Sequence, residues 1–356
     1  MESAVLRRRS EELLRERFGA GVTVARSEEI AGDASTRRYA RLWLEGPGAP
    51  RSAVAMILAD RGAALSSEEL GEVPPCEELP FVNVQRFLRS LGVPVPEIYV
   101  DATDEGLLLL EDVGDTSLRQ RLGEVAPGER MRLFERAIEE LVRIQVVGTA
   151  RRDERCVAFH QTFHEGVYLW EFGHFLEYGI EKRLGPLPGE TRTRLRGCFE
   201  RIARKLAAEP LVLSHRDYHA WNLFLQGERL RILDFQDALL AAAPYDLATL
   251  LGDRDTFEFL SEEDERSLVR YYATRWEEAG GKPWNFDHLW DVYSGCALQK
   301  AFKIVGRFHY LAEVKGKRAY LGYLPSTLRR LEVLFGRVEE GREIRGLLEP
   351  WFSRLA

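Results

Sequence analysis

The sequence feature that most restricts the fold is a polar run set between short apolar segments at residues 213–238, LSHRDYHAWNLFLQGERLRILDFQDA. It contains the tripeptide His-Arg-Asp ending at Asp217, then Asn222 five residues later, and Asp234 twelve residues after that. Two apolar stretches joined by a turn at Gly227 predict a β-hairpin between Asn222 and Asp234. Such a hairpin would bring its two ends close to the loop that carries Asp217. Three oxygen-bearing side chains are therefore predicted to converge.

Oxygen ligands of this kind suit a hard cation such as Mg²⁺, which binds one or two protein groups together with substrate phosphates. An Asp, an Asn five residues later and an Asp followed by Phe are also the residues that phosphoryl transfer uses in kinase-like folds. In this interpretation Asp217 is the catalytic residue that orients the acceptor hydroxyl, while Asn222 and Asp234 hold the metal. The pattern therefore predicts a phosphotransferase whose cofactors are ATP and Mg²⁺.

The spacing of the apolar residues changes at Thr116 and divides the chain into two lobes. Before this position, short alternating runs predict a small antiparallel sheet, and two segments have the apolar spacing of amphipathic helices. The runs are VTVAR, RYARLWL, SAVAMIL, IYVD and GLLLLED, and the helical segments are MESAVLRRRSEELLRERFGAG and FVNVQRFLRSLG. After it, the spacing is mostly helical. We expect an α+β fold with a small β-sheet N-terminal lobe at 1–113 and a mainly helical C-terminal lobe at 114–356.

Composition argues against several classes of partner. The net charge of −7 over 356 residues disfavours nucleic acid, because phosphate backbones bind net positive surfaces. Four cysteines occur without CxxC spacing, which favours reduced thiols over a zinc site or a disulfide framework. The N-terminal segment carries charges every few positions, and no apolar stretch approaches the length of a membrane span. We expect a cytoplasmic protein with no nucleic-acid partner and no membrane partner.

The segment HRDYHAWN resembles the HxDxxxxN catalytic loop of the aminoglycoside and choline kinase superfamily. DFQDA stands where protein kinases have DFG, and PYDLATLL at 244–251 resembles the P-x-x-D-L-A segment of that superfamily. The resemblance implies a two-lobed protein-kinase-like fold, in which 1–113 is a nucleotide-binding lobe ending in a hinge and 114–356 carries the catalytic loop and the acceptor site. It also implies that His215 and Asp246 brace the catalytic loop. No activation segment of the protein-kinase type follows, so we expect a small-molecule acceptor.

Four further segments are similar to the bacterial anomeric N-acetylmuramate/N-acetylglucosamine kinases, which phosphorylate these amino sugars at C1 during cell-wall recycling. They are GDASTRRYARL, PFVNVQRFLRSLGVPVPEIY, GLLLLEDVGD and LQKAFKIVGRF, and the similarity extends over most of the chain. It implies transfer of the γ-phosphoryl group of ATP to the anomeric hydroxyl of a small sugar. Two alternatives stay open: an aminoglycoside or other small-alcohol phosphotransferase, and a catalytically silent nucleotide-binding module.

By the same resemblance, GDASTRRY occupies the place of the phosphate loop, in which Ser35, Thr36 and Arg38 contact the nucleotide. Small residues there let backbone N–H groups approach phosphate oxygens. The third strand lacks the lysine that kinases use for the α- and β-phosphates, and no lysine precedes Lys182. The phosphate-binding cation must then be an arginine or be absent, and its absence would favour the silent module. We prefer Arg38 to Arg37, because strand alternation sends the two side chains to opposite faces.

The segment LLLLEDVGDTSL predicts the last strand of the N-terminal lobe, running into the hinge. By resemblance, Glu111, Asp112 and Val113 contact adenine. Main-chain groups fill this role, so it constrains the side chains little. A buried strand and turn is a compatible interpretation of the same residues.

Several side chains of the C-terminal lobe are candidates for contact with the acceptor. Trp170 and Glu171 in LWEFGHFLEY could offer a stacking face and a hydrogen-bonding edge to a sugar, although such a helical stripe is more often core. His219 follows Asp217 closely and could contact either the acceptor or the loop backbone. Asp237 could brace the loop or contact a hydroxyl group.

Three basic residues recur at helical spacing in QKAFKIVGR. Lys300, Lys303 and Arg307 at this spacing are typical of a solvated basic face. A carboxylate on the acceptor, such as the lactyl group of N-acetylmuramate, would also find partners there. Lys303 is our candidate for that contact.

Overall fold

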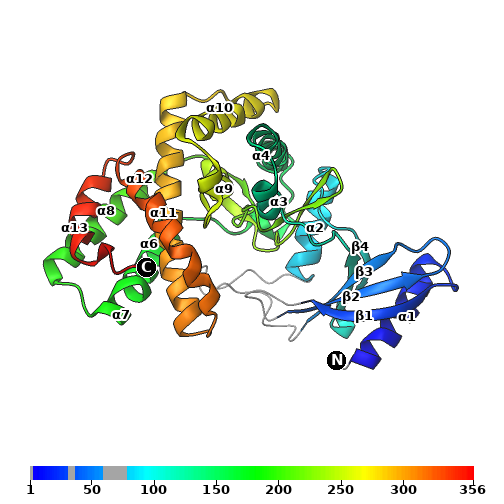
Figure 1. Ribbon diagram of the computed structural model, residues 1–356. Coiled ribbons are helices and arrows are strands. Elements are labelled where there is room, and N and C mark those ends of the chain that lie inside the picture. The colour runs from blue at the N-terminus through cyan, green and yellow to red at the C-terminus, as the bar shows by residue number, and fades with distance from the viewer. Residues whose placement is uncertain (1–2, 31–36, 59–77) are drawn as a thin grey trace. The chain divides into compact units, whose positions relative to one another are not determined.

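The computed structural model of the protein describes residues 3–30, 37–58 and 78–356. By its internal contacts the chain forms two compact units (Figure 1). Unit 1 consists of Met1–Asp115 and Phe224–Gln236, and unit 2 consists of Thr116–Leu223 and Asp237–Ala356. The predicted α+β fold class is confirmed, because unit 1 is built on an antiparallel sheet and unit 2 is mainly helical.

Unit 1 contains a five-stranded antiparallel sheet with the strand order β1-β2-β3-β5-β4. Its elements are β1 (Thr23–Ile30), β2 (Arg38–Glu45), β3 (Ser52–Ile57), β4 (Ile98–Ala102), the 3-10 turn η1 (Thr103–Glu105) and β5 (Leu107–Glu111). Alternate residues of β2, namely Ala40, Leu42 and Leu44, are buried, as the period of two in RYARLWL requires. All five predicted strands are confirmed.

Two helices of unit 1 lie where the apolar periodicity predicts them. The first, α1 (Ser3–Phe18), packs Leu6 and Leu14 into the hydrophobic core that the sheet forms. Gly19 follows it in the left-handed conformation, and its N–H donates to the carbonyl of the last turn. The second, α2 (Pro80–Ser90), begins with a proline at its first position and buries its apolar face.

The predicted hairpin is confirmed as β7 (Leu223–Gln226) and β8 (Arg229–Ile232). The backbone N–H of Ile232 donates to the carbonyl of Pro94 at 3.0 Å, so the hairpin packs with unit 1. The sequence-based boundary leaves this segment in the second lobe. A local pattern predicts that a hairpin forms, but the lobe against which it packs depends on residues more than a hundred positions away.

Unit 2 is built from helices around α11 (Phe286–Glu313), which contacts α6, η4, α8, α9, η6 and α12 and is buried along most of its length (Figure 1). The other helices are α3 (Leu118–Glu124), α4 (Pro127–Val142), η2 (Arg143–Val147), α5 (Gly148–Ala150), η3 (Val157–Phe159), α6 (Glu165–His174), η4 (Phe175–Glu181), α7 (Lys182–Leu184), α8 (Gly189–Ala207), α9 (Pro244–Gly252), η5 (Thr256–Phe259), α10 (Glu262–Glu278), η6 (Arg318–Tyr323), α12 (Leu324–Phe335) and α13 (Gly341–Phe352). None of the helices in the described ranges is long and apolar enough to cross a lipid bilayer.

Unit 2 also contains a two-stranded antiparallel sheet, β6 (Leu211–Ser214) with β9 (Leu239–Ala242). The sequence predicts β6 but not β9, because a run as short and uniformly apolar as LLAA does not distinguish a strand from a helix. The catalytic-loop sequence follows directly after β6, and α9 begins soon after β9. The small sheet therefore brings the start of α9 beside the loop.

Candidate active site

A buried carboxylate on α9 holds the start of the catalytic loop. Asp246 is 0% exposed, and its oxygens accept hydrogen bonds from the backbone N–H groups of His215 at 2.6 Å and Arg216 at 2.9 Å. These bonds fix Arg216 in the left-handed region with φ 75°, a conformation that costs a non-glycine residue about 1–3 kcal/mol. Burial raises the pKa of Asp246, and the charge of His215 opposes that increase. The backbone is thus fixed immediately before Asp217.

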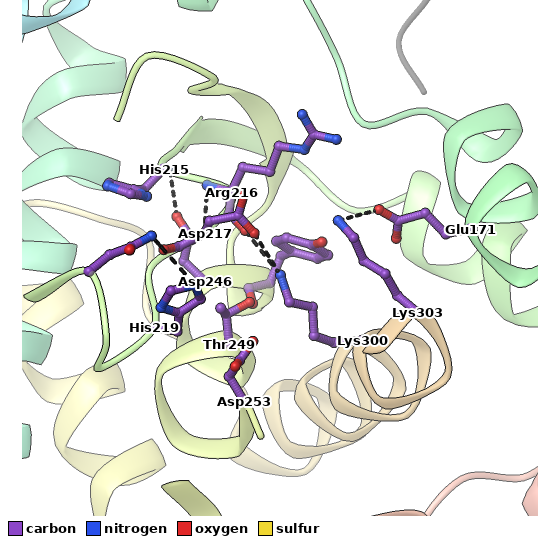
Figure 2. Close-up of polar contacts among 12 residues, drawn as sticks. Glu171, His215, Arg216, Asp217, His219, Asp246, Thr249, Asp253, Lys300 and Lys303 are labelled. Carbon is purple, nitrogen blue, oxygen red and sulfur yellow. Dashed lines mark hydrogen bonds and ion pairs between the residues drawn. The ribbon is translucent and has the colours of Figure 1, made fainter. Parts of the chain in front are cut away.

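Asp217 forms an ion pair with a lysine from α11 (Figure 2). The Nζ atom of Lys300 lies 3.1 Å from Oδ1 of Asp217 and also donates to the backbone carbonyl of Arg216 at 3.3 Å. The Lys300 side chain is 4% exposed, whereas that of Asp217 is 35% exposed. Burial raises the pKa of Asp217, but the charges of Lys300 and then Lys303 outweigh burial and hold it well below its usual value. Asp217 is therefore an ionised carboxylate with one accessible side.

His219 and Asn222 complete the loop. The His219 side chain is buried, and burial lowers its pKa to about 4, so the imidazole is neutral near pH 7. The amide nitrogen of Asn222 donates to the backbone carbonyl of Asp217 at 3.0 Å and lies 3.4 Å from Nε2 of His219. Because the nitrogen faces the loop, the amide oxygen of Asn222 is the atom left to face a cation.

This orientation bears on the predicted metal. Within residues 3–30, 37–58 and 78–356, no three His, Cys, Asp or Glu side chains gather in an arrangement that could hold a metal ion. Mg²⁺ needs no such cluster, because it takes one or two protein oxygens and completes its shell with water and phosphate. An amide oxygen at Asn222 therefore fits Mg²⁺ and would not fit a metal that requires several imidazole or thiolate ligands.

Glu171 and Lys303 form a second buried ion pair beside the first (Figure 2). Nζ of Lys303 lies 2.5 Å from Oε1 of Glu171, and Gln299 donates to Oε2 at 2.5 Å. The Glu171 side chain is 0% exposed and that of Lys303 is 13% exposed. The prediction of a solvated basic face is therefore wrong for Lys300 and Lys303, because each ammonium group turns inward to a carboxylate.

Two other predicted acceptor contacts lie at different places in unit 2. Trp170 is on α6 and stacks on His174, with ring centres 5.1 Å apart and planes inclined by 15°. His174 in turn lies 5.3 Å from the ring of Tyr310 on α11. Asp237 precedes β9 and is partly exposed.

Asp234 belongs to unit 1, where it follows β8. Like Arg216, it has a left-handed backbone, with φ 62°, and its Oδ1 accepts a hydrogen bond from the side chain of Gln236 at 2.8 Å. Burial raises the pKa of Tyr39, Arg37 lowers it, and Asp234 adds a smaller increase. Arg37 and Asp234 therefore both lie within electrostatic reach of the Tyr39 phenol. A strained residue with an exposed carboxylate is typical of functional sites.

The predicted phosphate loop is described only in part. Ser35 and Thr36 lie outside the described residues. Arg38 begins β2 and pairs with Glu29 at 2.8 Å, with more than half of each side chain exposed. β3 carries no lysine, in agreement with the sequence.

The predicted hinge residues form a polar network with the hairpin of unit 1. Gln226 donates to the backbone carbonyl of Asp112 at 3.1 Å, and Arg231 pairs with Glu111 at 2.8 Å. The backbone N–H of Glu111 donates to the carbonyl of Glu97, just before β4, at 2.8 Å, and Val113 is buried. The side chain of Glu111 and the backbone carbonyl of Asp112 thus connect the end of β5 to the hairpin.

Sequence reasoning missed the partnership of Lys300 with Asp217. Its signal was present, because both lysines of LQKAFKIVG lie between apolar residues on a helix that is apolar nearly all round. A helix of this kind is buried, and a cation within it needs a buried carboxylate.

Comparison with known proteins identifies similar sequences. Residues 27–284 match the phosphotransferase enzyme family. An N-acetylmuramate/N-acetylglucosamine kinase of Pseudomonas aeruginosa is 31% identical over 324 residues, which cover 89% of this chain and 86% of the relative. A protein of the same name from Neisseria meningitidis serogroup B is 31% identical over 275 residues, covering 76% of this chain and 78% of the relative.

Solved structures with the same fold are more distant in sequence. A choline kinase from Cryptosporidium parvum aligns over 99% of this chain and 99% of its own, with a TM-score of 0.61 and 11% identity. An ADP-bound aminoglycoside phosphotransferase aligns over 93% of this chain and 98% of its own, with a TM-score of 0.55 and 14% identity. At these identities the likeness establishes the fold alone.

Proposed function

The chain belongs to the phosphotransferase enzyme family, and we propose that it transfers the γ-phosphoryl group of ATP to the anomeric C1 hydroxyl of N-acetylmuramate or N-acetylglucosamine. One observation carries the proposal: the carboxylate of Asp217 is held ionised by Lys300 in a chain 31% identical to kinases named for these two sugars. A reaction that consumes ATP runs where ATP is present, so we infer that it takes place in the cytoplasm, in the reuse of cell-wall sugars.

The proposed role of Asp217 is to orient the acceptor hydroxyl. A carboxylate with a lowered pKa is a weak base, so it suits hydrogen bonding to the hydroxyl better than early removal of the proton. The anomeric hydroxyl is more acidic than an ordinary alcohol and needs less help to ionise. Positioning, rather than proton abstraction, is therefore the main contribution that we assign to Asp217.

The neighbouring side chains fit an uncharged sugar ring. His219 is neutral near pH 7, so it can exchange hydrogen bonds with a hydroxyl or acetamido group without adding charge. We propose His219, Trp170 and Asp237 as acceptor contacts. Glu171 and Lys303 neutralise each other. We propose that this ion pair holds α6 and α11 together beside the acceptor site.

The nucleotide and metal assignments rest on the sequence motifs. We propose Asn222 and Asp234 as ligands of Mg²⁺, which when bound would neutralise charge on the nucleotide phosphates. The amide orientation of Asn222 and the exposed carboxylate of Asp234 each suit this role. The proposed nucleotide contacts are Ser35, Thr36, Arg38, Glu111, Asp112 and Val113.

A substrate panel tests the acceptor class. ATP consumption by the purified protein is measured with N-acetylmuramate, N-acetylglucosamine, glucose, choline and kanamycin. We expect turnover with the two N-acetylated amino sugars at a kcat/KM at least about 100-fold above the others, because a site that hydrogen-bonds a substrate amide discriminates strongly against acceptors that lack it. Turnover confined to kanamycin or choline would replace the proposal with the alternative phosphotransferase classes.

The methyl glycoside of N-acetylglucosamine tests the position of transfer, because its anomeric oxygen carries no proton. We expect no turnover of the glycoside and loss of the reducing end in the product formed from the free sugar. Equal turnover of the glycoside would assign transfer to another hydroxyl. Stabilisation by Mg·ATP without turnover of any acceptor would favour a nucleotide-binding module.

A further inference from the structure

Arg254 stands out among the cations near the catalytic loop. It follows α9 with a left-handed backbone, φ 53°, and its side chain is only 13% exposed. Its Nε lies 3.3 Å from Oδ1 of Asp253. Within the described residues, no group accepts a hydrogen bond from its two terminal nitrogens. The Nε atom of the guanidinium group is therefore held near Asp253, while its two terminal nitrogens stay available to a ligand.

Four aromatic rings surround this guanidinium group. Its central carbon lies 5.5 Å from the ring centre of Trp221 in the catalytic loop and 5.9 Å from that of Phe308 on α11. The corresponding distances to Tyr320 and Tyr323 of η6 are 5.6 and 5.8 Å. Ring faces attract a guanidinium group and displace water from its flanks, which strengthens any interaction made at its tip.

His219 links Arg254 to the catalytic carboxylate. After burial, the charges that act on the imidazole are those of Asp253 and Arg254, followed by those of Asp217 and Lys300. The imidazole of His219 thus lies within electrostatic reach of two ion pairs, one containing the proposed catalytic residue and the other containing Arg254. Trp221, which packs against Arg254, immediately precedes Asn222. Arg254 therefore lies in the same loop region as Asp217.

The two lysines of α11 near the loop each pair with a carboxylate. Lys300 forms an ion pair with Asp217, and Lys303 forms an ion pair with the fully buried Glu171. Drawing Lys303 to a substrate would leave the fully buried Glu171 unpaired, which is strongly unfavourable, and drawing Lys300 away would remove the partner of Asp217. Arg254 can bind an anion through its terminal nitrogens and still keep its Nε contact with Asp253.

We infer that Arg254 binds a carboxylate on the acceptor sugar, so that the site distinguishes N-acetylmuramate from N-acetylglucosamine. The inference rests on the proposed function. The two sugars differ in the lactyl ether of N-acetylmuramate, which ends in a carboxylate, and a guanidinium fork matches a carboxylate in geometry and charge. The sequence suggests Lys303 as the residue that contacts this carboxylate, and we assign the contact to Arg254 instead.

The test is a cycle of two proteins and three acceptors. kcat/KM is measured for the wild type and Arg254→Met with N-acetylmuramate, its neutral lactyl amide, and N-acetylglucosamine. Loss of one charge-assisted contact should lower kcat/KM of Arg254→Met with N-acetylmuramate about 10- to 100-fold. The wild type should lose a similar factor with the amide, whereas Arg254→Met should hardly discriminate acid from amide. N-acetylglucosamine should be turned over within about threefold by both proteins, which also reports that the variant is folded.

Two further variants sharpen the cycle. Arg254→Lys should recover part of the preference for the acid, because it restores the charge without the fork. Arg307→Met is the matched control, since Arg307 also packs on an aromatic ring of α11, 5.2 Å from the ring centre of Tyr310. The inference is overturned if Arg254→Met lowers turnover of all three acceptors equally, or if Arg307→Met abolishes the preference instead. Wild-type protein that turns over neither sugar would refute the proposed function and this inference together.

Discussion

The ammonium group of Lys300 on α11 lies 3.1 Å from the Asp217 carboxylate, and it also donates to the carbonyl of the residue before Asp217. One side chain thus contacts both the carboxylate and the backbone that carries it. Since α11 is buried along most of its length, the ammonium group is held as firmly as the core of unit 2. The Asp217 carboxylate is therefore positioned from two sides, by Lys300 and by the Asp246 contacts with the loop backbone.

Replacement of Lys300 should lower kcat without changing the affinity for the nucleotide. Lys300→Met removes the charge and both hydrogen bonds, so kcat should fall about 100-fold through misorientation of Asp217 while nucleotide affinity stays within about twofold. Lys300→Arg should retain most of the turnover. Lys205→Met is the matched control and should behave as the wild type, because Lys205 is half exposed and pairs with the exposed Glu339 at 2.6 Å. Its second partner, the buried Glu340, keeps Arg201 at 3.5 Å in the variant. Equal loss of kcat in Lys300→Arg and Lys300→Met would mean that the charge is not what matters.

Asp246→Asn should weaken the loop. An amide can accept from only one of the two backbone N–H groups and presents a donor to the other, which should cost about 2–3 kcal/mol in the free energy of unfolding. Turnover should also fall, since Arg216 would leave its left-handed conformation more easily. Denaturant unfolding and steady-state kinetics measure the two effects. A variant with unchanged stability and turnover would show that Asp246 does not hold the loop.

A pH-dependent stability should come from Glu265, which pairs with Arg330 and accepts a hydrogen bond from Tyr293 of α11 at 2.5 Å. Burial raises the pKa of Glu265, but Arg330 and then Arg337 lower it to about 2. Because the folded-state pKa is depressed, the carboxylate stabilises the fold above pH 4.5, and that stabilisation is lost as the pH falls from 4.5 towards 2. The contribution is about 3 kcal/mol at neutral pH.

Unfolding of Glu265→Gln, measured from pH 7 to pH 3, tests this contribution. The variant should be less stable than the wild type at pH 7, and the difference should shrink as the pH falls below 4.5. Glu339→Gln serves as the control, because the Glu339 side chain is 80% exposed. A difference between Glu265→Gln and wild type that does not change with pH would contradict the assignment.

Gly306 should be intolerant of a side chain. A Cβ atom at this position would lie 2.7 Å from Cα of Phe175, where α11 crosses η4. Gly306→Ala should therefore destabilise the protein by about 1–3 kcal/mol through overpacking. At Gly197 on α8 the nearest atom would lie 3.8 Å away, so Gly197→Ala should be neutral or stabilising by up to about 1 kcal/mol. Thermal unfolding of both variants distinguishes the two positions, and equal stability would contradict the close crossing.

Local patterns predicted much of this fold. The five strands of unit 1 and the β7–β8 hairpin follow from alternation and turn residues, because each is decided within a few positions. β9 was missed, since LLAA becomes a strand only by pairing with β6. Assignment of the hairpin to unit 1 likewise depends on a contact between Ile232 and Pro94 that no local pattern contains.

The candidate site was predictable to the same extent. Asp217 and Asn222 could be identified because their spacing lies within one loop. The pairing of Asp217 with Lys300 was missed, because the two residues are 83 positions apart and the apolar neighbours of Lys300 indicate burial without indicating which carboxylate it meets. Arg254 is recognisable only once Trp221, Tyr320 and Phe308 are known to surround it. Long-range contacts, rather than residue types, decided these roles.

The most direct test of the account is single-turnover phosphoryl transfer to N-acetylmuramate by Asp217→Asn at saturating Mg·ATP. The substitution keeps the shape of the side chain and removes the charge that we propose orients the acceptor. The rate should fall about 10²- to 10⁴-fold while Mg·ATP still stabilises the protein against thermal unfolding. A rate within about tenfold of the wild type would contradict the role of Asp217 on which the proposed function depends.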